Sequence, residues 1–139
     1  MSKRIIYTQE NGLIALVSLA PEATIADCIP PNTPYLEIDE SELPDTTTLI
    51  DYFDALTINF SLSAIDIDLS KAREVTKDIL RVQREPLFQK NDLQLRDAII
   101  SGNKTEIDLY VKERDRLRDI TTIVDKISSF SELKALRLV

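Results

Sequence analysis

Apolar and polar residues alternate along the first half of the chain, which is typical of half-buried β-strands. Strand-like runs cover residues 4–8, 13–19 and 34–39, and two shorter runs follow at 56–60 and 65–69. Asn11-Gly12 lies between the first two runs, and an Asn-Gly pair supplies the positive φ angles of a tight hairpin turn. The pattern therefore predicts an antiparallel sheet that begins with a β-hairpin. A short helical turn is expected at 21–27 and a loop at 40–48.

From Ser70 onward the apolar positions repeat about every 3.6 residues, as in amphipathic helices. Ser70 is the expected N-cap of the first helix, and Ser129 opens a capping-box pattern before the last one. Pro86 predicts a kink or a restart, and Gly102 predicts a left-handed helix stop. The expected helices are 70–85, 87–101, 105–127 and 130–138.

One apolar stripe on the first of these helices has two interpretations. The stripe steps by three, four and three residues through Ala72, Val75, Ile79 and Val82. It forms either a groove for a partner or the inner face of the helical hairpin, and the second interpretation is favoured because helix stripes usually pack in a core.

These elements predict an α+β fold with two parts. Residues 1–68 form a small N-terminal antiparallel β-sheet domain, and residues 69–139 form a C-terminal helical hairpin or bundle. The charge divides in the same way: residues 1–68 have a net charge of −10, and the rest have +3, within the total of −7. Such asymmetry favours head-to-tail packing of subunits or docking on a basic partner.

Several residue types are missing or scarce, and this restricts the possible functions. The chain has no histidine, a single cysteine and two glycines. Imidazole-based triads, thiolate zinc sites and glycine-rich phosphate loops are therefore excluded. Cys28 lies beside Ile29 and Pro30 and is interpreted as a small buried hydrophobic residue. We expect no catalytic residues, no cofactor and no metal, hence a protein that is not an enzyme.

The N-terminal acids and the basic helix each suggest a binding site that is not favoured. Asp51, Asp54, Asp66 and Asp68 resemble a hard-cation site, but the alternation around Ile65 and Ile67 places the last two on the outer face of a strand. The basic helix 71–90 could bind phosphates, yet acids are interleaved with its cations and the whole chain is acidic. The favoured source of the opposite charge is a protein partner or the acidic N-terminal half of a neighbouring copy.

The order of these motifs resembles a family of bacteriophage and prophage tail proteins. The matching segments are Ile5-Ile6-Tyr7, PYLEIDESELP (34–44), Tyr52-Phe53-Asp54-Ala55-Leu56, Ser70-Lys71-Ala72-Arg73-Glu74, Leu80-Arg81 with Arg84, Pro86-Leu87, Arg96-Asp97-Ala98, Ser101-Gly102-Asn103, Leu117-Arg118-Asp119 and Glu132-Leu133-Lys134-Ala135. The resemblance is to small tail assembly chaperone-like, tail-fibre-associated proteins. Relatives usually have a Leu-Asp pair where this chain has Asn91-Asp92.

The resemblance implies a non-enzymatic tail protein that acts through protein contacts. It is expected to be either a tail or tail-fibre assembly chaperone or a small structural subunit retained in the tail or baseplate. Its partners are then other tail, fibre or baseplate proteins or its own copies, in the host cytoplasm during assembly and, for a retained subunit, in the virion tail. Neither nucleic acid nor a membrane is an expected partner. The basic residues Lys77, Arg81 and Arg84 are the candidate partner-binding residues. The alternative function is a phage-derived nucleic-acid-binding regulator that uses helix 71–90.

Overall fold

A computed structural model of the chain describes residues 3–138. The chain forms two compact units, one that runs up to Ala72 and one that begins at Arg73. Strands lie in the first unit and the long helices in the second, so the α+β prediction is confirmed. The boundary falls within the first turn of helix α3 (Leu69–Ser101), close to the boundary at residue 68 that the sequence suggests.

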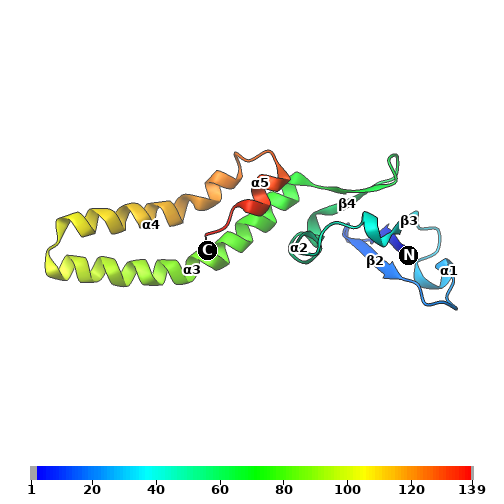
Figure 1. The fold of residues 1–139 in the computed structure, drawn as a ribbon, viewed down its shortest axis with the longest axis horizontal. Helices are drawn as coiled ribbons and strands as arrows, with labels where there is room; N and C mark the ends of the chain where they lie inside the picture. Colours follow the sequence, from blue (N-terminus) through cyan, green and yellow to red (C-terminus); the bar gives the residue numbers. More distant parts are fainter. Residues whose placement is uncertain (1–2, 139) are drawn as a thin grey trace. The chain divides into compact units, whose positions relative to one another are not determined.

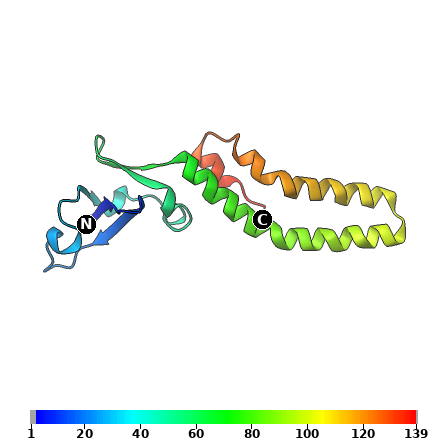
Figure 2. The same ribbon diagram turned by 180° about the vertical axis from the view of Figure 1, so that it is seen from behind.

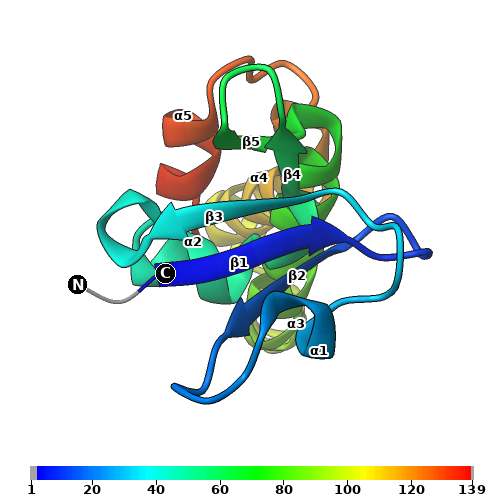
Figure 3. The same ribbon diagram turned by 90° about the vertical axis from the view of Figure 1, so that its right-hand side faces the viewer.

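The first unit contains the predicted antiparallel sheet. Strand β1 (Lys3–Thr8) lies between β2 (Ile14–Ser18) and β3 (Tyr35–Asp39), as Figure 3 shows. The register places Ile6 opposite Leu16 on one side and Leu36 on the other. Ile5 and Ile6 point to opposite faces because they are adjacent in a strand, and both are buried. The central strand is therefore covered on both faces.

The turn between β1 and β2 differs in detail from the prediction. Gly12 has a φ of 84°, whereas Asn11 is not among the residues with positive φ. The Gly12 N–H donates to the Gln9 carbonyl at 3.0 Å, and the Gln9 N–H donates to the Leu13 carbonyl at 2.8 Å. The loop is thus longer than a two-residue turn, and Gly12 alone supplies the left-handed conformation. The hairpin itself is confirmed.

Short helices join the strands of the first unit. Helix α1 (Ile25–Cys28) begins at Thr24, whose backbone and hydroxyl both donate to the Asp27 carboxylate at 3.1 and 2.8 Å. The loop predicted at 40–48 is wrong for most of its length. It contains a 3-10 turn, η1 (Glu40–Glu42), and the start of α2 (Thr46–Asp51). The Asp45 carboxylate accepts from the Thr48 N–H at 2.9 Å, an N-cap that begins α2 after Pro44.

A second hairpin completes the first unit, as predicted from the alternation at 56–69. After a 3-10 turn, η2 (Phe53–Ala55), strand β4 (Leu56–Asn59) pairs antiparallel with β5 (Ala64–Ile67). The core of this unit is largely aliphatic, with one fully buried aromatic side chain, Tyr52. Its other buried apolar residues are Ile5, Ile6, Ile14, Ile38, Ala55, Leu56 and Ala72.

Helix α3 replaces the two helices predicted at 70–85 and 87–101. It continues through Pro86 without a break, and Figure 1 shows its axis bending between the green and the yellow-green parts. A proline removes one backbone hydrogen bond and bends a helix without ending it when packing holds both sides. The expected N-cap Ser70 lies inside the helix. Asp68 takes this role, because its carboxylate accepts from the Lys71 N–H at 3.2 Å.

The end of α3 follows the predicted glycine stop. Gly102 has a φ of 71°. Its N–H donates to the Ile99 carbonyl at 3.2 Å, and the Asn103 N–H donates to the Ala98 carbonyl at 3.1 Å. This pair of bonds is a Schellman motif. The Asn103 side chain then accepts from the Glu106 N–H at 3.2 Å and caps helix α4 (Lys104–Val124), so two residues suffice to reverse the chain.

The last two helices are shorter than predicted. Helix α4 ends at Val124 and not at 127, and α5 covers Phe130–Ala135 and not 130–138. Ser129 is the N-cap of α5, but its side chain makes no capping hydrogen bond, so the predicted capping box does not form. Figure 2 shows α3 and α4 running antiparallel as a hairpin, with α5 beside one end of it.

The buried face of α3 is rotated from the predicted stripe. Thr76 and Leu80 are fully buried, whereas Val82 is 75% exposed. Val75 and Ile79 are half-buried. The interpretation of the stripe as the inner face of the hairpin is therefore wrong for Val82. The apolar pattern was misleading because the inner face of α3 is itself partly polar.

Candidate functional site

The first predicted partner-binding residue, Lys77, lies on the side of α3 that faces the end of α4. Its Nζ is 2.7 Å from the carboxylate of Asp125 and 3.3 Å from that of Glu74. The side chain is only 15% exposed. The hydrogen bond to Asp125 raises the pKa of Lys77, so the side chain stays charged throughout the physiological range. Lys77 thus joins α3 to the chain just after α4.

Arg84 lies one heptad further on and makes similar internal contacts. Its Nη1 donates to the carbonyl oxygens of Leu117 and Arg118 at 3.3 and 3.2 Å. The guanidinium carbon is 5.5 Å from the centroid of the Phe88 ring, within the range of a cation–π contact. Arg84 therefore binds the backbone of α4 and is only partly available to a partner.

Arg81 differs from the other two candidates because its ion pair lies within α3. Its side chain is 48% exposed, and its Nη1 is 2.7 Å from the Asp78 carboxylate one turn earlier. An exposed pair of this kind contributes about 0–1 kcal/mol to stability. The structure thus brings Lys77 and Arg84 together on the seam between α3 and α4 and leaves Arg81 as the exposed cation.

Two further polar residues belong to the same seam and were not singled out from the sequence. Arg73 donates from Nε and Nη2 to the carbonyl of Ile127 at 3.0 and 2.8 Å. Asn91 donates from Nδ2 to the carbonyl of Tyr110 at 3.0 Å. We call Arg73, Lys77, Arg84 and Asn91 the polar seam. Their spacing of four, seven and seven residues is a heptad pattern and was the signal available in the sequence.

Because of the polar seam, few of the residues buried between the antiparallel helices α3 and α4 are apolar in the part of the hairpin near its turn. Between Arg84 and Ala98 the only buried residue on α3 is Asn91, which is 2% exposed. Side chains of α3 that donate to backbone carbonyls of α4 fix the register of the two helices. A carbonyl in a helix can accept such a second hydrogen bond because its oxygen has two lone pairs. The polar seam is suited to keeping α3 and α4 in a fixed register. Its side chains do not form a catalytic set.

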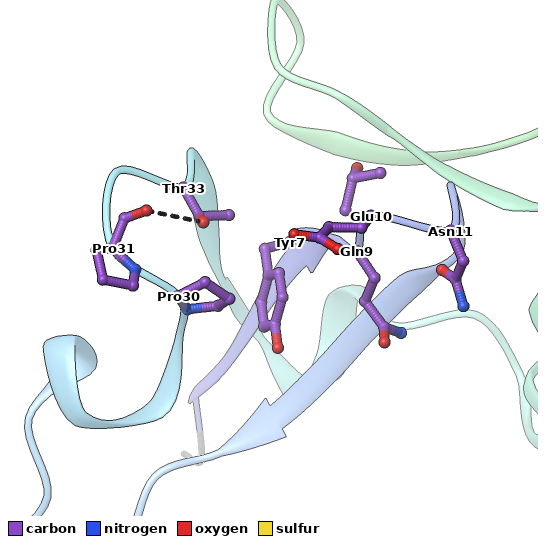
Figure 4. A pocket seen from close by; sticks show the side chains of 8 residues that line it. Tyr7, Gln9, Glu10, Asn11, Pro30, Pro31 and Thr33 are labelled. Atoms are coloured by element: carbon purple, nitrogen blue, oxygen red, sulfur yellow. Dashed lines mark hydrogen bonds between the residues drawn. The ribbon is translucent and has the colours of Figure 1, made fainter.

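The first unit has an open depression around Pro30-Pro31. It has a volume of about 530 Å³ and contains Tyr7, Glu10 and Asn11 from the first hairpin (Figure 4). Thr33 Oγ1 lies 3.5 Å from the Pro31 carbonyl oxygen and donates to it. A second depression of about 500 Å³ shares the two prolines and adds Ile25, Ile29 and Tyr35. Both are shallow, and the groups in them form no nucleophile–base pair.

Two of the four acidic residues considered as a cation site have structural roles. Asp66 accepts from the Asn59 side chain at 3.0 Å across the β4–β5 hairpin. Asp68 caps α3, so its assignment to the outer face of a strand is wrong. Within residues 3–138 no three His, Cys, Asp or Glu side chains are grouped as metal ligands. Cys28 is half-buried with a free thiol.

Among the described helices, none is both long and apolar enough to cross a membrane. Comparison of the chain with protein-family models, with curated proteins and with solved structures finds no match.

Proposed function

We propose that this chain is a non-enzymatic phage tail protein that works through protein–protein contacts. It acts either as an assembly chaperone for tail or tail-fibre proteins or as a small structural subunit of the tail or baseplate. The family resemblance of the sequence motivates the phage context.

The observation that best supports binding to proteins is the apolar character of the hairpin around its turn. Five large aliphatic side chains in residues 93–111 are more than 40% exposed: Leu93, Ile99, Ile100, Leu109 and Val111. Exposed apolar groups that gather in one region mark interaction sites in soluble proteins. A pair of helices with a polar seam inside and apolar residues exposed around its turn is suited to binding other proteins.

The two forms of the proposal are separated by mass spectrometry of particles and of assembly intermediates from the phage or prophage that encodes the chain. A structural subunit is expected in purified particles at a fixed ratio to the other tail proteins. A chaperone is expected in intermediates and not in finished particles. Absence from both overturns the proposal.

A nucleic-acid-binding assay tests the alternative function, a phage-derived nucleic-acid-binding regulator. The interleaved acids of α3, such as Glu74, Asp78 and Glu85, lead us to expect no retention of duplex DNA or RNA at about 150 mM salt. Retention that is lost steeply with added salt would favour a regulator and count against a tail protein.

A further inference from the structure

The two depressions of the first unit adjoin each other and form one larger open surface. Both contain Pro30, Pro31 and Thr33, and each adds one tyrosine, Tyr7 in the first and Tyr35 in the second. The strand register places Tyr7 directly opposite Tyr35 on β1 and β3, so the two side chains are on the same face of the sheet. We call the surface formed by the residues of both depressions the Tyr–Pro site.

The Tyr–Pro site offers mainly hydrogen-bond acceptors. A proline has a backbone carbonyl but no N–H, so Pro30 and Pro31 contribute acceptors only. The carboxylate of Glu10, an exposed residue of the first depression, adds further acceptors and a negative charge. Gln9 donates from Nε2 to the Ile14 carbonyl at 3.1 Å, which leaves its Oε1 as an acceptor. The complement of such a surface is a group that donates several hydrogen bonds.

The first unit supplies no cation of its own to this site. Lys3 and Arg4 are the only basic residues between positions 1 and 70. Both are at the start of β1, where Lys3 is 3.9 Å from the Glu37 carboxylate and Arg4 is 3.5 Å from that of Glu40. The Tyr–Pro site is at the other end of this strand. Among the residues that the structure describes, Glu10 belongs to no ion pair. Its charge is therefore unbalanced, within a unit that is itself strongly acidic, and attracts a cation.

The two tyrosines indicate which cation fits the site. Tyr35 is 42% exposed and Tyr7 is half-buried, so part of each ring is accessible. A guanidinium group stacks on an aromatic ring and donates from several N–H groups in one plane, whereas an ammonium is a compact and strongly hydrated charge. The aliphatic stem of an arginine can also lie on the apolar surface of Pro30 and Pro31. Arginine therefore fits the Tyr–Pro site better than lysine does.

The shape of the site favours an arginine that is part of a protein. Pockets for small molecules enclose most of the ligand surface. The Tyr–Pro site instead consists of two open depressions of about 530 and 500 Å³ beside each other. Asn11 accepts from the Leu13 N–H through Oδ1 at 3.0 Å, so its Nδ2 remains available to donate to a peptide carbonyl. An extended segment can place an arginine in one depression and continue across the other.

We propose that the Tyr–Pro site binds an arginine side chain in an extended segment of a partner protein. The guanidinium stacks on Tyr7 and donates to the Glu10 carboxylate, and the segment crosses Pro30-Pro31 towards Tyr35. The inference goes beyond the proposed function, since it assigns a partner chemistry to residues of the first unit. It holds whether or not the chain is a tail protein.

Nuclear magnetic resonance of the ¹⁵N-labelled full chain tests the proposal with three peptides of equal length. In these peptides threonine alternates with arginine, with lysine or with glutamate. The arginine peptide is expected to shift the amide signals of residues 7–11 and 33–35 and to bind about threefold more tightly than the lysine peptide. The glutamate peptide is expected not to bind. Equal affinity for the arginine and lysine peptides overturns the proposal, and so do shifts that spread over all acidic segments of the first unit.

Matched variants test the assigned residues. Glu10→Gln and Tyr7→Leu are each expected to weaken binding of the arginine peptide about three- to fivefold. The controls are Asp51→Asn, another exposed acid of the first unit, and Phe60→Leu, an aromatic residue of the same unit that is 45% exposed. Neither control residue lines the Tyr–Pro site.

The dispersion of the amide signals shows whether each variant is folded. Glu10 is in the loop between β1 and β2, so Glu10→Gln remains a test if Tyr7→Leu does not fold. A loss of affinity in Asp51→Asn as large as in Glu10→Gln would show attraction to the acidic unit as a whole and overturn the proposal.

A second copy of the chain is the competing occupant, and dilution of the chain without peptide tests it. The signals of Tyr7 and Tyr35 are expected to be independent of protein concentration. Shifts at these residues as the concentration rises would show that another copy occupies the Tyr–Pro site, and would overturn its assignment to a different protein.

Discussion

Asn91 donates its side-chain Nδ2 to the carbonyl oxygen of Tyr110 at 3.0 Å, while its Oδ1 is buried without a partner. The two atoms of one amide thus have opposite effects. The bond to Tyr110 aligns α3 with α4, and the unpaired oxygen destabilises the folded state, because burial removes it from water.

Asn91→Leu is expected to increase the free energy of unfolding by about 1 kcal/mol, since it removes an unpaired polar atom and adds apolar contact. Tyr110 lies inside α4, where its carbonyl can keep its helical hydrogen bond. Urea denaturation measures the change. Asn91→Asp is the contrast: it buries a carboxylate at the same place and should destabilise. A loss of stability in Asn91→Leu would show that the side-chain bond outweighs the unpaired oxygen.

Gly102→Ala is expected to lower the free energy of unfolding by about 1 kcal/mol, and Gly102→Val by more. The reason is the backbone alone: φ is 71°, and no atom lies within 4 Å of a Cβ built there. Thermal melting is the measurement. Gly102→Asn is the control, because Asn tolerates the left-handed region and should have a smaller effect. Equal melting temperatures for all three variants would contradict the backbone explanation.

Pro86→Ala is expected to stabilise the chain by about 1–3 kcal/mol, because a proline inside a helix lacks a hydrogen-bond donor and crowds the preceding turn. Pro86 is exposed within α3, so little packing is lost. Denaturation in urea at low protein concentration measures this without interference from association. The control is Gln89→Ala, an exposed position three residues on, where the expected change is small. No gain for Pro86→Ala would mean that α3 already accommodates the proline without strain.

The strands were predictable because their signal is local. Alternation in 4–8 and 34–39 and the Asn11-Gly12 pair depend only on neighbouring residues, and β1, β2 and β3 follow them. The continuity of α3 was not predictable from its sequence, since whether a helix passes through Pro86 depends on what packs on either side of it.

The candidate site was harder to predict for a related reason. A basic side chain in a sequence suggests a charged partner, but Arg84 binds carbonyl oxygens 33 and 34 residues away in the chain. Backbone acceptors carry no sequence signal, so only the heptad spacing of the polar seam indicated such contacts. The apolar pattern alone instead selected Val82, which is on the outer side.

Acid is expected to destabilise the second unit through two exposed carboxylates. Hydrogen bonds from Arg116 lower the pKa of Glu113, and hydrogen bonds from Arg118 lower the pKa of Asp119. The unfolded chain then binds more protons than the folded one near their ordinary pKa values of about 4. The contribution of both pairs is complete above that range and is lost as the pH falls through the lowered values.

Melting temperatures between about pH 7 and 2.5 measure this loss, in the range where carboxyl groups titrate. Glu113→Gln should flatten the acid side of the curve. Glu106→Gln near the start of α4 leaves both pairs intact and is the matched control. If Glu113→Gln and the wild type lose stability in parallel on acidification, the Arg116 pair contributes nothing to the folded state.

Arg84 and Arg81 are a matched pair for separating stability from binding. Arg84→Met is expected to lower the free energy of unfolding by about 1–2 kcal/mol, because it removes the bonds to the Leu117 and Arg118 carbonyls. Arg81→Met should change it by less than about 0.5 kcal/mol, since only an exposed pair with Asp78 is lost.

Arg81 also allows a test of the predicted binding of a protein partner by the basic residues Lys77, Arg81 and Arg84 of α3. Arg81→Glu should leave the melting temperature nearly unchanged and reduce incorporation into particles or intermediates, with a weaker salt dependence of association. Arg84→Glu would not separate the two effects, because the loss of Arg84 also destabilises the hairpin. If Arg81→Glu is incorporated as well as the wild type, Arg81 belongs to a solvated face of α3 and binds no partner. Binding to tail proteins would then have to use other surfaces, such as the exposed apolar residues around the hairpin turn.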